Sequence, residues 1–342
     1  MTKTVLLTGA SGYIAKHIAL QLLEAGYHVR GTVRDLGRGA EVTEAVRPQL
    51  SDDSDLAVRL TFVILDLTED AGWTDAMNGV DVLMHTASPF PLDQPKHEDD
   101  LIRPAVDGAM RALRAAHAAG ITRVVLTSST AAISGSALPA GDTSFDETNW
   151  TDPTDPDVAA YARSKTLAEQ AAWDFVRNDA PDMNLTTINP GFVLGAPLDQ
   201  HFGSSIQVIE RLLRGKDPML PDIGFATVDV LDVAEMHVMV IEKPETFGQR
   251  IMAVDSFQSF KDLAQAVKIA FPDRKMPTRV APNFLIRLLA RFDPTIKSIV
   301  PNLGRVDKID NARALATVGR GMRQARKAAV SSAKYLIDNK LV

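Results

Sequence analysis

The sequence predicts an α/β protein in which a doubly wound parallel sheet is followed by a smaller C-terminal lobe. Short runs rich in Val, Leu and Ile are continuous rather than alternating, as strands buried on both faces of a sheet are. They span residues 4–8, 28–33, 60–66, 80–86, 123–129 and 185–190. Stretches with apolar residues three and four positions apart lie between them, and two of these, 14–26 and 109–120, end at a glycine suited to a helix cap. Because strand and helix alternate, right-handed crossovers and a parallel sheet are expected.

The regular alternation ends after residue 190. Loops rich in Gly and Pro follow, with helices between them, and segment 225–242 has the pattern of a return to the sheet. We therefore predict one domain of residues 1–190 plus 225–255. Residues 191–224 plus 256–342 form the smaller lobe, which covers the open side of the sheet and is the expected substrate-binding lobe.

Composition excludes several classes of protein. The 342 residues carry a formal net charge of −6 and no cysteine, which argues against a nucleic-acid binder and excludes disulfides and thiolate chemistry. No apolar run approaches the roughly 20 residues that cross a bilayer, and the N-terminus lacks the pattern of a secretion signal. We expect a cytoplasmic protein, and we expect the basic run 320–329 to form the solvated face of the last helix.

A glycine turn follows the first strand and opens the first helix, in the stretch LLTGASGYIAKHI. Gly9, Gly12 and Ala15 are spaced three apart, one residue longer between the first two than the G-x-G-x-x-G pattern. Such glycines let the backbone approach a pyrophosphate at the helix N-terminus, and the small third residue lets helix and strand pack closely. The large domain is therefore predicted to be a Rossmann-type dinucleotide-binding fold.

The end of the second strand selects between NAD and NADP. An acid at this position bonds the ribose hydroxyls of NAD, whereas an arginine accommodates the 2′-phosphate of NADP. Arg34 takes the position, and Arg38 can reach the same phosphate. Asp35 is the competing residue, because its carboxylate could turn inward and favour NAD. We predict NADP(H).

Two further strand ends carry small or polar residues at the same edge. Asp66 ends the third strand, where its carboxylate can accept from an adenine amine. Thr86, Ala87 and Ser88 follow the fourth strand, with small side chains where the backbone passes under a cofactor. A plain helix cap is the alternative for each of these strand-end residues.

Among the four tyrosines, only Tyr161 has a lysine, Lys165, four residues on, which places the two on one helix face. A nearby ammonium favours the phenolate and is expected to lower the pKa of the phenol, so that Tyr161 can protonate a carbonyl oxygen as a hydride reaches its carbon. A hydroxyl from LTSST, at the end of the fifth strand, would hold that oxygen. The alternative is that Tyr161 merely packs and Lys165 pairs with Glu169 in an exposed bridge.

The motifs TGASGYIA, GTVRD, DLTED, HTASP, VLTSS, YARSK and NPGFVLG occur in the order found in extended short-chain dehydrogenases/reductases. Over about residues 4 to 255 the chain resembles the dihydroflavonol 4-reductase and cinnamoyl-CoA reductase branch, which includes microbial aldehyde and ketone reductases. It departs from plant members in reading STAAIS after the serine, so the resemblance does not imply flavonoid or phenylpropanoid substrates.

The resemblance implies a catalytic set of Ser129, Tyr161 and Lys165, with Ser128 as the alternative serine. It assigns Gly9, Ser11, Gly12, Tyr13 and Ile14 to the pyrophosphate loop. It implies the following further cofactor contacts: Arg34, Arg38, Asp66, Leu67, Thr86, Ala87, Ser88, Tyr161, Lys165, Pro190, Val193 and Ser204 or Ser205.

The acidic cluster His97, Glu98, Asp99 and Asp100 lacks a second histidine at ligand spacing, so we predict a helix N-terminus and no metal site. The lobe contains several phenylalanines, consistent with an apolar substrate: Phe192, Phe202, Phe225, Phe284 and Phe292.

These observations together predict an NADP(H)-dependent carbonyl reductase or alcohol dehydrogenase for a small to medium, fairly hydrophobic aldehyde or ketone, acting as a monomer or homodimer. An NAD-dependent nucleotide-sugar epimerase or dehydratase would use the same catalytic set, but Arg34 argues against NAD. A non-catalytic NADP-sensing module is the other alternative, and the retained Tyr161 and Lys165 argue against it.

Overall fold

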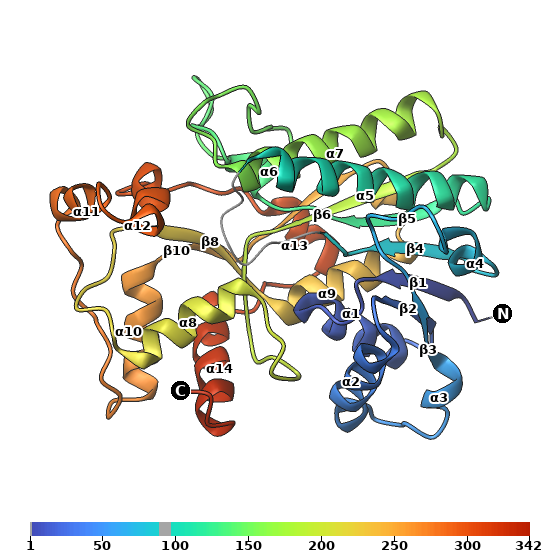
Figure 1. Cartoon of the computed structure of the whole chain (residues 1–342), viewed down its shortest axis with the longest axis horizontal. Coiled ribbons are helices and arrows are strands. Elements are labelled where there is room, and N and C mark those ends of the chain that lie inside the picture. Colours follow the sequence, from blue (N-terminus) through green and yellow to red (C-terminus); the bar gives the residue numbers. More distant parts are fainter. Residues whose placement is uncertain (1, 89–96) are drawn as a thin grey trace.

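The computed structural model describes residues 2–88 and 97–342 and contains two sheets (Figure 1). The larger has seven strands, all paired in parallel, in the order β3-β2-β1-β4-β5-β6-β9. Its strands are β1 (Thr4–Thr8), β2 (His28–Val33), β3 (Leu60–Ile64), β4 (Val82–His85), β5 (Arg123–Thr127), β6 (Asn184–Pro190) and β9 (Arg250–Ala253). The order reverses direction at β1, so the predicted doubly wound parallel sheet is confirmed.

Helices cover both faces of this sheet. In Figure 1, α5 (Asp99–Ala118) and α7 (Ala160–Asn178) pack together above it, while α1 (Tyr13–Glu24), α2 (Leu36–Val46) and α9 (Val230–Met239) lie below. Burial on both faces explains the continuous apolar runs, since residues such as Leu6 and Leu7 are both fully buried. The shorter helices here are α3 (Leu56–Arg59), α4 (Trp73–Met77), α6 (Ala131–Ser134), and the 3₁₀ turns Arg47–Gln49, Val240–Glu242 and Pro244–Thr246.

Predicted and observed boundaries differ where a polar or helix-breaking residue intervenes. The runs 4–8 and 28–33 match β1 and β2 in full, whereas β5 ends at Thr127, before two serines that turn toward the cavity described below. Helix α5 begins ten residues before the predicted stretch 109–120 and contains Pro104. Proline lacks the amide hydrogen that a helix interior uses, so the sequence pattern did not predict a helix before residue 109.

A second sheet of three strands, in the order β10-β8-β7, forms the other half of the molecule. It consists of β7 (Phe192–Leu194), β8 (Gly224–Asp229) and β10 (Ser256–Ser259), with β10 antiparallel to β8. The remaining helices are α8 (Ser204–Arg214), α10 (Phe260–Ala270), α11 (Asn283–Leu289), α12 (Pro294–Ile299), α13 (Ala312–Val318), α14 (Ala325–Asp338) and the 3₁₀ turn Val300–Asn302. No helix in the described part of the chain has the length and hydropathy needed to span a bilayer.

The predicted return of segment 225–242 to the large sheet is wrong for its strand. Residues 225–229 belong to β8, which pairs with β7 and β10 in the second sheet. The strand that rejoins the large sheet is β9, which pairs with β6. Only the helical part, α9, packs against the large domain through α1. Because β8 and β9 both contain apolar residues, composition alone does not predict which sheet each strand joins.

The basic run 320–329 is also not simply a solvated face. Arg320 and Arg323 precede α14 and form ion pairs with Asp232 and Glu235 on α9. The Asp232 side chain is fully buried, so these pairs fasten the C-terminal segment to the large domain.

Gly191 connects the two sheets, between β6 and β7. Its amide donates to the Ala253 carbonyl at 3.1 Å, and a Cβ at this position would lie only 2.0 Å from the Ala226 carbonyl oxygen of β8. The close approach of two backbones therefore requires glycine here.

We expect Gly191→Ala to lower the free energy of unfolding by about 1–3 kcal/mol, because the backbone of β8 must shift to admit the methyl group. Urea denaturation followed by circular dichroism measures the change. Gly321→Ala is the matched control, since a Cβ there would meet no atom within 4 Å. Equal stability of the two variants would contradict the steric explanation.

Candidate active site

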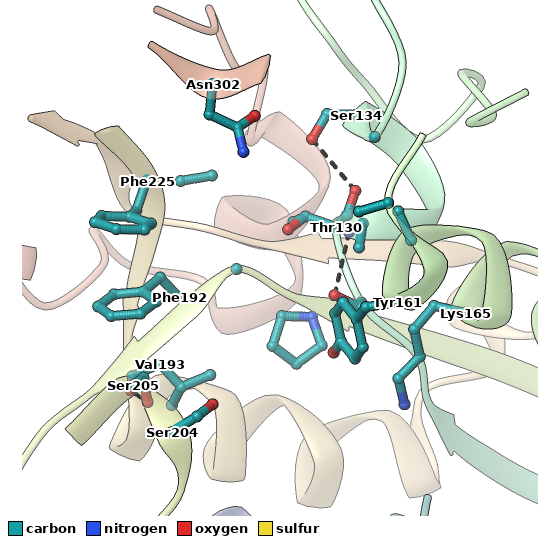
Figure 2. A pocket seen from close by; sticks show the side chains of 18 of the residues that line it. Thr130, Ser134, Tyr161, Lys165, Phe192, Val193, Ser204, Ser205, Phe225 and Asn302 are labelled. Atoms are coloured by element: carbon teal, nitrogen blue, oxygen red, sulfur yellow. Dashed lines mark hydrogen bonds between the residues drawn. The ribbon is translucent and has the colours of Figure 1, made fainter. Parts of the chain in front are cut away.

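A cavity of about 1250 Å³ lies where the carboxyl edge of the large sheet faces the smaller lobe. Figure 2 shows Tyr161 and Lys165 on one wall, with Phe192 and Phe225 side by side across the cavity. Many of the residues predicted from the sequence line it: Gly9, Gly12, Tyr13, Ile14, Thr86, Ser128, Ser129, Tyr161, Lys165, Pro190, Val193, Ser204 and Ser205.

The glycine turn forms one end of this cavity. Gly9 has a φ of +66°, and a Cβ on it would lie 2.9 Å from Ala87 Cα, so the turn needs glycine both for its conformation and for its space. Helix α1 starts at Tyr13 with no side-chain hydrogen bond to its first amides, which leaves them available to an anion. The Tyr13 hydroxyl donates to the Gly195 carbonyl at 2.9 Å and is buried, so its backbone rather than its side chain belongs to this site.

Hydrogen bonds fasten the ends of β1 and β4 to each other. The Thr8 hydroxyl accepts from the amides of Thr86 and Ala87, both at 3.1 Å, and the Thr86 hydroxyl donates to the Thr8 carbonyl at 2.5 Å. His85 bonds the same Thr8 hydroxyl at 2.9 Å, and burial lowers its pKa to about 3. The segment after β4 is therefore held rigidly beside the glycine turn.

The residues predicted to select the cofactor lie beyond the cavity, at the ends of β2 and β3. Asp35 is the N-cap of α2 and accepts from the Gly37 amide at 2.6 Å, so its carboxylate is already engaged. Arg34 is exposed, and Arg38 pairs with Glu41 at 2.6 Å. Hydrogen bonds from Thr68 lower the pKa of Asp66, and the Arg34 cation adds to this effect. The strand ends that precede Arg34 and Asp66 are adjacent, because Val33 of β2 pairs with Ile64 of β3. Ser11, Leu67, Ala87 and Ser88 also lie outside the cavity lining.

Ser129 and Tyr161 both line the cavity, and burial raises the pKa of Tyr161 while a hydrogen bond from the Ser129 hydroxyl lowers it. The Ser129 oxygen also accepts from the Ala131 amide at 3.1 Å, and the Lys165 ammonium lies 5.8 Å from the centre of the Tyr161 ring. The three predicted catalytic side chains thus face one cavity.

Ser128 and Glu169 are hydrogen-bonded to each other. The Ser128 hydroxyl donates to Glu169 at 2.5 Å, away from Tyr161, which favours Ser129 as the reacting serine. Glu169 is fully buried and pairs with Arg250 at 2.7 Å, so the alternative of an exposed Lys165–Glu169 bridge is wrong.

Burial shifts the pKa values of both Tyr161 and Lys165. Burial raises the pKa of Tyr161, and the hydrogen bond from Ser129 opposes this shift. The pKa of Tyr161 therefore lies above its ordinary value, contrary to our prediction from the spacing, because burial outweighs the neighbouring groups. Burial also lowers the pKa of Lys165 to about 8, and the charge of Glu169 opposes that shift.

The smaller lobe contributes the start of α8. This helix begins at Ser204 without a side-chain cap, so its first amides also face the cavity. The Ser205 hydroxyl donates to the Val193 carbonyl at 2.5 Å, which favours Ser204 as the predicted phosphate contact from this helix.

Sequence reasoning missed the polar far end of the cavity. Arg305 donates to the carbonyls of Ser134 and Ser136 at 2.6 and 2.9 Å and to Asp307 at 2.7 Å. Asn302 lines the same region. No motif marks these residues, since only the fold brings the lobe to the loop after Ser129.

The structure also tests the predictions for the acidic cluster and for two of the phenylalanines. Asp99 and Asp100 lie in the first turn of α5 and Glu98 pairs with Arg163, which confirms the acidic helix N-terminus. Phe284 and Phe292 are 73% and 82% exposed, so neither forms part of the cavity.

Comparison with known proteins places these features in a family. The model of the NAD dependent epimerase/dehydratase family matches residues 5–254. A ketoreductase of Aspergillus niger is 35% identical over 315 residues, covering 86% of this chain and 90% of that one. A cinnamoyl-CoA reductase of Medicago truncatula is 34% identical, covering 81% of this chain and 83% of that one. The crystal structure of yeast methylglyoxal/isovaleraldehyde reductase complexed with NADPH superposes with a TM-score of 0.79 at 26% identity, covering 99% of this chain and all of that one.

We expect Arg34→Ala to lower the preference for NADPH over NADH about tenfold or more, because a charged hydrogen bond to the 2′-phosphate is lost. Asp35→Asn is the control: asparagine still caps α2, so the preference should change less than about twofold. Fluorescence titration with both nucleotides measures the ratio. A loss of NADH affinity in Asp35→Asn would show that Asp35 binds the ribose instead.

Proposed function

The chain belongs to the NAD dependent epimerase/dehydratase family, the extended short-chain dehydrogenases/reductases, and we propose that it is an NADP(H)-dependent reductase of neutral, fairly hydrophobic aldehydes or ketones. The observation that carries the proposal is that Ser129, Tyr161 and Lys165 line the same cavity as the glycine turn. The family name alone also includes epimerases, but nothing in the geometry of the described residues favours that reaction.

The residues around the glycine turn fit a dinucleotide. The space that a Cβ on Gly9 would fill, and the uncapped start of α1, suit a pyrophosphate. Arg34 and Arg38 lie at the edge where a 2′-phosphate would extend, and the engagement of Asp35 as a helix cap removes the acid that would favour NAD. NADPH, when bound, supplies the hydride.

The chain's own residues manage the proton. Tyr161 donates its phenolic proton to the carbonyl oxygen, and the raised pKa suits a group that must hold its proton until the oxygen gains charge. Ser129 donates a hydrogen bond to the same oxygen and stabilises the developing negative charge. The Lys165 ammonium lies beside the ring and stabilises the phenolate that remains.

The far part of the cavity supports an apolar, uncharged substrate. Phe192 and Phe225 stack with ring centres 4.3 Å apart, and Phe257 lines the same region. Among the described residues, the carboxylates of Asp155, Asp157 and Asp307 also line the cavity, and the Arg305 guanidinium in this lining is paired with Asp307. Apolar rings attract an aryl or alkyl group, whereas the carboxylates disfavour an anion such as a CoA thioester.

The direct test follows NADPH and NADH oxidation with aryl and alkyl ketones, aldehydes, diketones and a CoA thioester. We expect turnover with NADPH and neutral carbonyl compounds, and little with NADH or the thioester. Turnover of the thioester alone would contradict the substrate class. Purified protein that carries tightly bound NAD and turns over none of these compounds would favour an epimerase instead.

We expect Tyr161→Phe to lower kcat by about 10²–10⁴-fold and to leave NADPH affinity nearly unchanged, because only the proton donor is lost. Stopped-flow kinetics and fluorescence titration measure the two effects. Tyr27→Phe, which removes a surface hydrogen bond to Glu242, is the matched control and should behave as the wild type. Full turnover by Tyr161→Phe would identify a different proton donor.

A further inference from the structure

A buried carboxylate lies directly behind the proposed catalytic residues. Glu169 is on α7, one helical turn beyond Lys165, and its side chain is fully withdrawn from solvent. Its ion-pair partner is Arg250 of β9, which is 7% exposed. The pair joins α7 to the last strand of the large sheet.

Each oxygen of Glu169 accepts several hydrogen bonds. Oε2 accepts from the Ser128 hydroxyl at 2.5 Å and the Asn189 amide at 2.7 Å, and Oε1 accepts from Thr187 at 3.0 Å and Arg250 Nε at 2.7 Å. Asn189 also donates to the Ser129 carbonyl at 3.2 Å. The carboxylate therefore binds the Ser128 side chain directly and reaches the Ser129 carbonyl through the Asn189 side chain.

Arg250 is held equally firmly. It donates to the carbonyls of Glu147 and Asn149 at 2.9 and 2.7 Å, and its guanidinium stacks on Trp150 at 3.6 Å. These contacts hold the guanidinium in place, and the guanidinium in turn holds the carboxylate of Glu169.

We propose that Glu169 is a positioning residue for the reduction: it fixes Ser129 through Ser128 and Asn189, and its negative charge keeps Lys165 an ammonium. The inference rests on the proposed function, since Ser129 and Lys165 act in that reaction.

The surroundings of Lys165 leave few other sources of such an effect. In the part of the chain that the structure describes, the titratable groups that interact with Lys165 are Tyr161 and Glu169 on its own helix and His85 at the end of β4. His85 is uncharged at neutral pH because burial lowers its pKa to about 3. Burial lowers the pKa of Lys165 to about 8, and Glu169 is the charge that opposes it.

The test compares Glu169→Gln with the wild type in two measurements. In the protein without substrate, the titration of Lys165, followed by NMR of ¹³C-lysine and assigned with Lys165→Arg, should move about one pH unit or more toward acid. In turnover, activity falls as pH rises through the pKa of Lys165, so the alkaline limb should move in the same direction. Glu169→Asp keeps the charge and should restore the limb toward its wild-type position.

Asp232→Asn is the matched control, because it breaks another buried carboxylate–arginine pair outside the cavity. It should lower stability and leave both titrations unchanged. If Glu169→Gln does not fold, Ser128→Ala takes its place and should lower kcat several-fold with an unchanged KM for NADPH.

A Lys165 titration in Glu169→Gln that matches the wild type would overturn the proposed charge effect, and a wild-type kcat in Ser128→Ala would overturn the positioning of Ser129. A wild-type enzyme that turns over no carbonyl compound would instead contradict the proposed reduction, and the NMR titration would still decide the effect on Lys165.

Discussion

The carboxylate of Glu169 and the guanidinium of Arg250, both withdrawn from water, join α7 to the last strand of the large sheet. Taking two charges out of water is costly unless hydrogen bonds satisfy the remaining oxygens and protons. Here Ser128, Thr187 and Asn189 do so. Ser128 follows β5 and lines the cavity, while Thr187 and Asn189 belong to β6, which ends at the cavity-lining Pro190. The requirement to satisfy one buried charge thereby fixes the geometry of the site.

The opposite end of the cavity depends on close backbone approach instead of charge. Gly9 lies against Ala87, and the Thr8 hydroxyl bonds the amides that follow β4, so two strand ends act as one rigid unit. Asp35 contributes to cofactor selection by capping α2, since a capped carboxylate is no longer available to a ribose. The end of β2 can therefore carry the acid Asp35 and still favour the 2′-phosphate of NADP.

The two sheets contribute different chemical groups to the cavity. The large domain supplies hydroxyls, the ammonium of Lys165 and the N-terminus of α1 at the carboxyl edge of its sheet, where ligands of such folds bind. The small sheet supplies the stacked rings of Phe192 and Phe225, and the segment after α12 supplies Arg305. Gly191 sets the distance between the two contributions, because it allows the backbone of β7 to pass against β8.

The sequence by itself determined the fold class, the glycine turn and the Tyr161–Lys165 pair, because strand burial, tight turns and one helical turn are short-range properties. It could not place residues 225–229 in the right sheet, since apolar strands look alike until their hydrogen-bonding partners are known. It also could not find Arg305 at the cavity or the partner of Glu169, which lies 81 residues away. The raised pKa of Tyr161 was likewise decided by the tertiary structure, because burial is a property of the packed chain and not of a spacing.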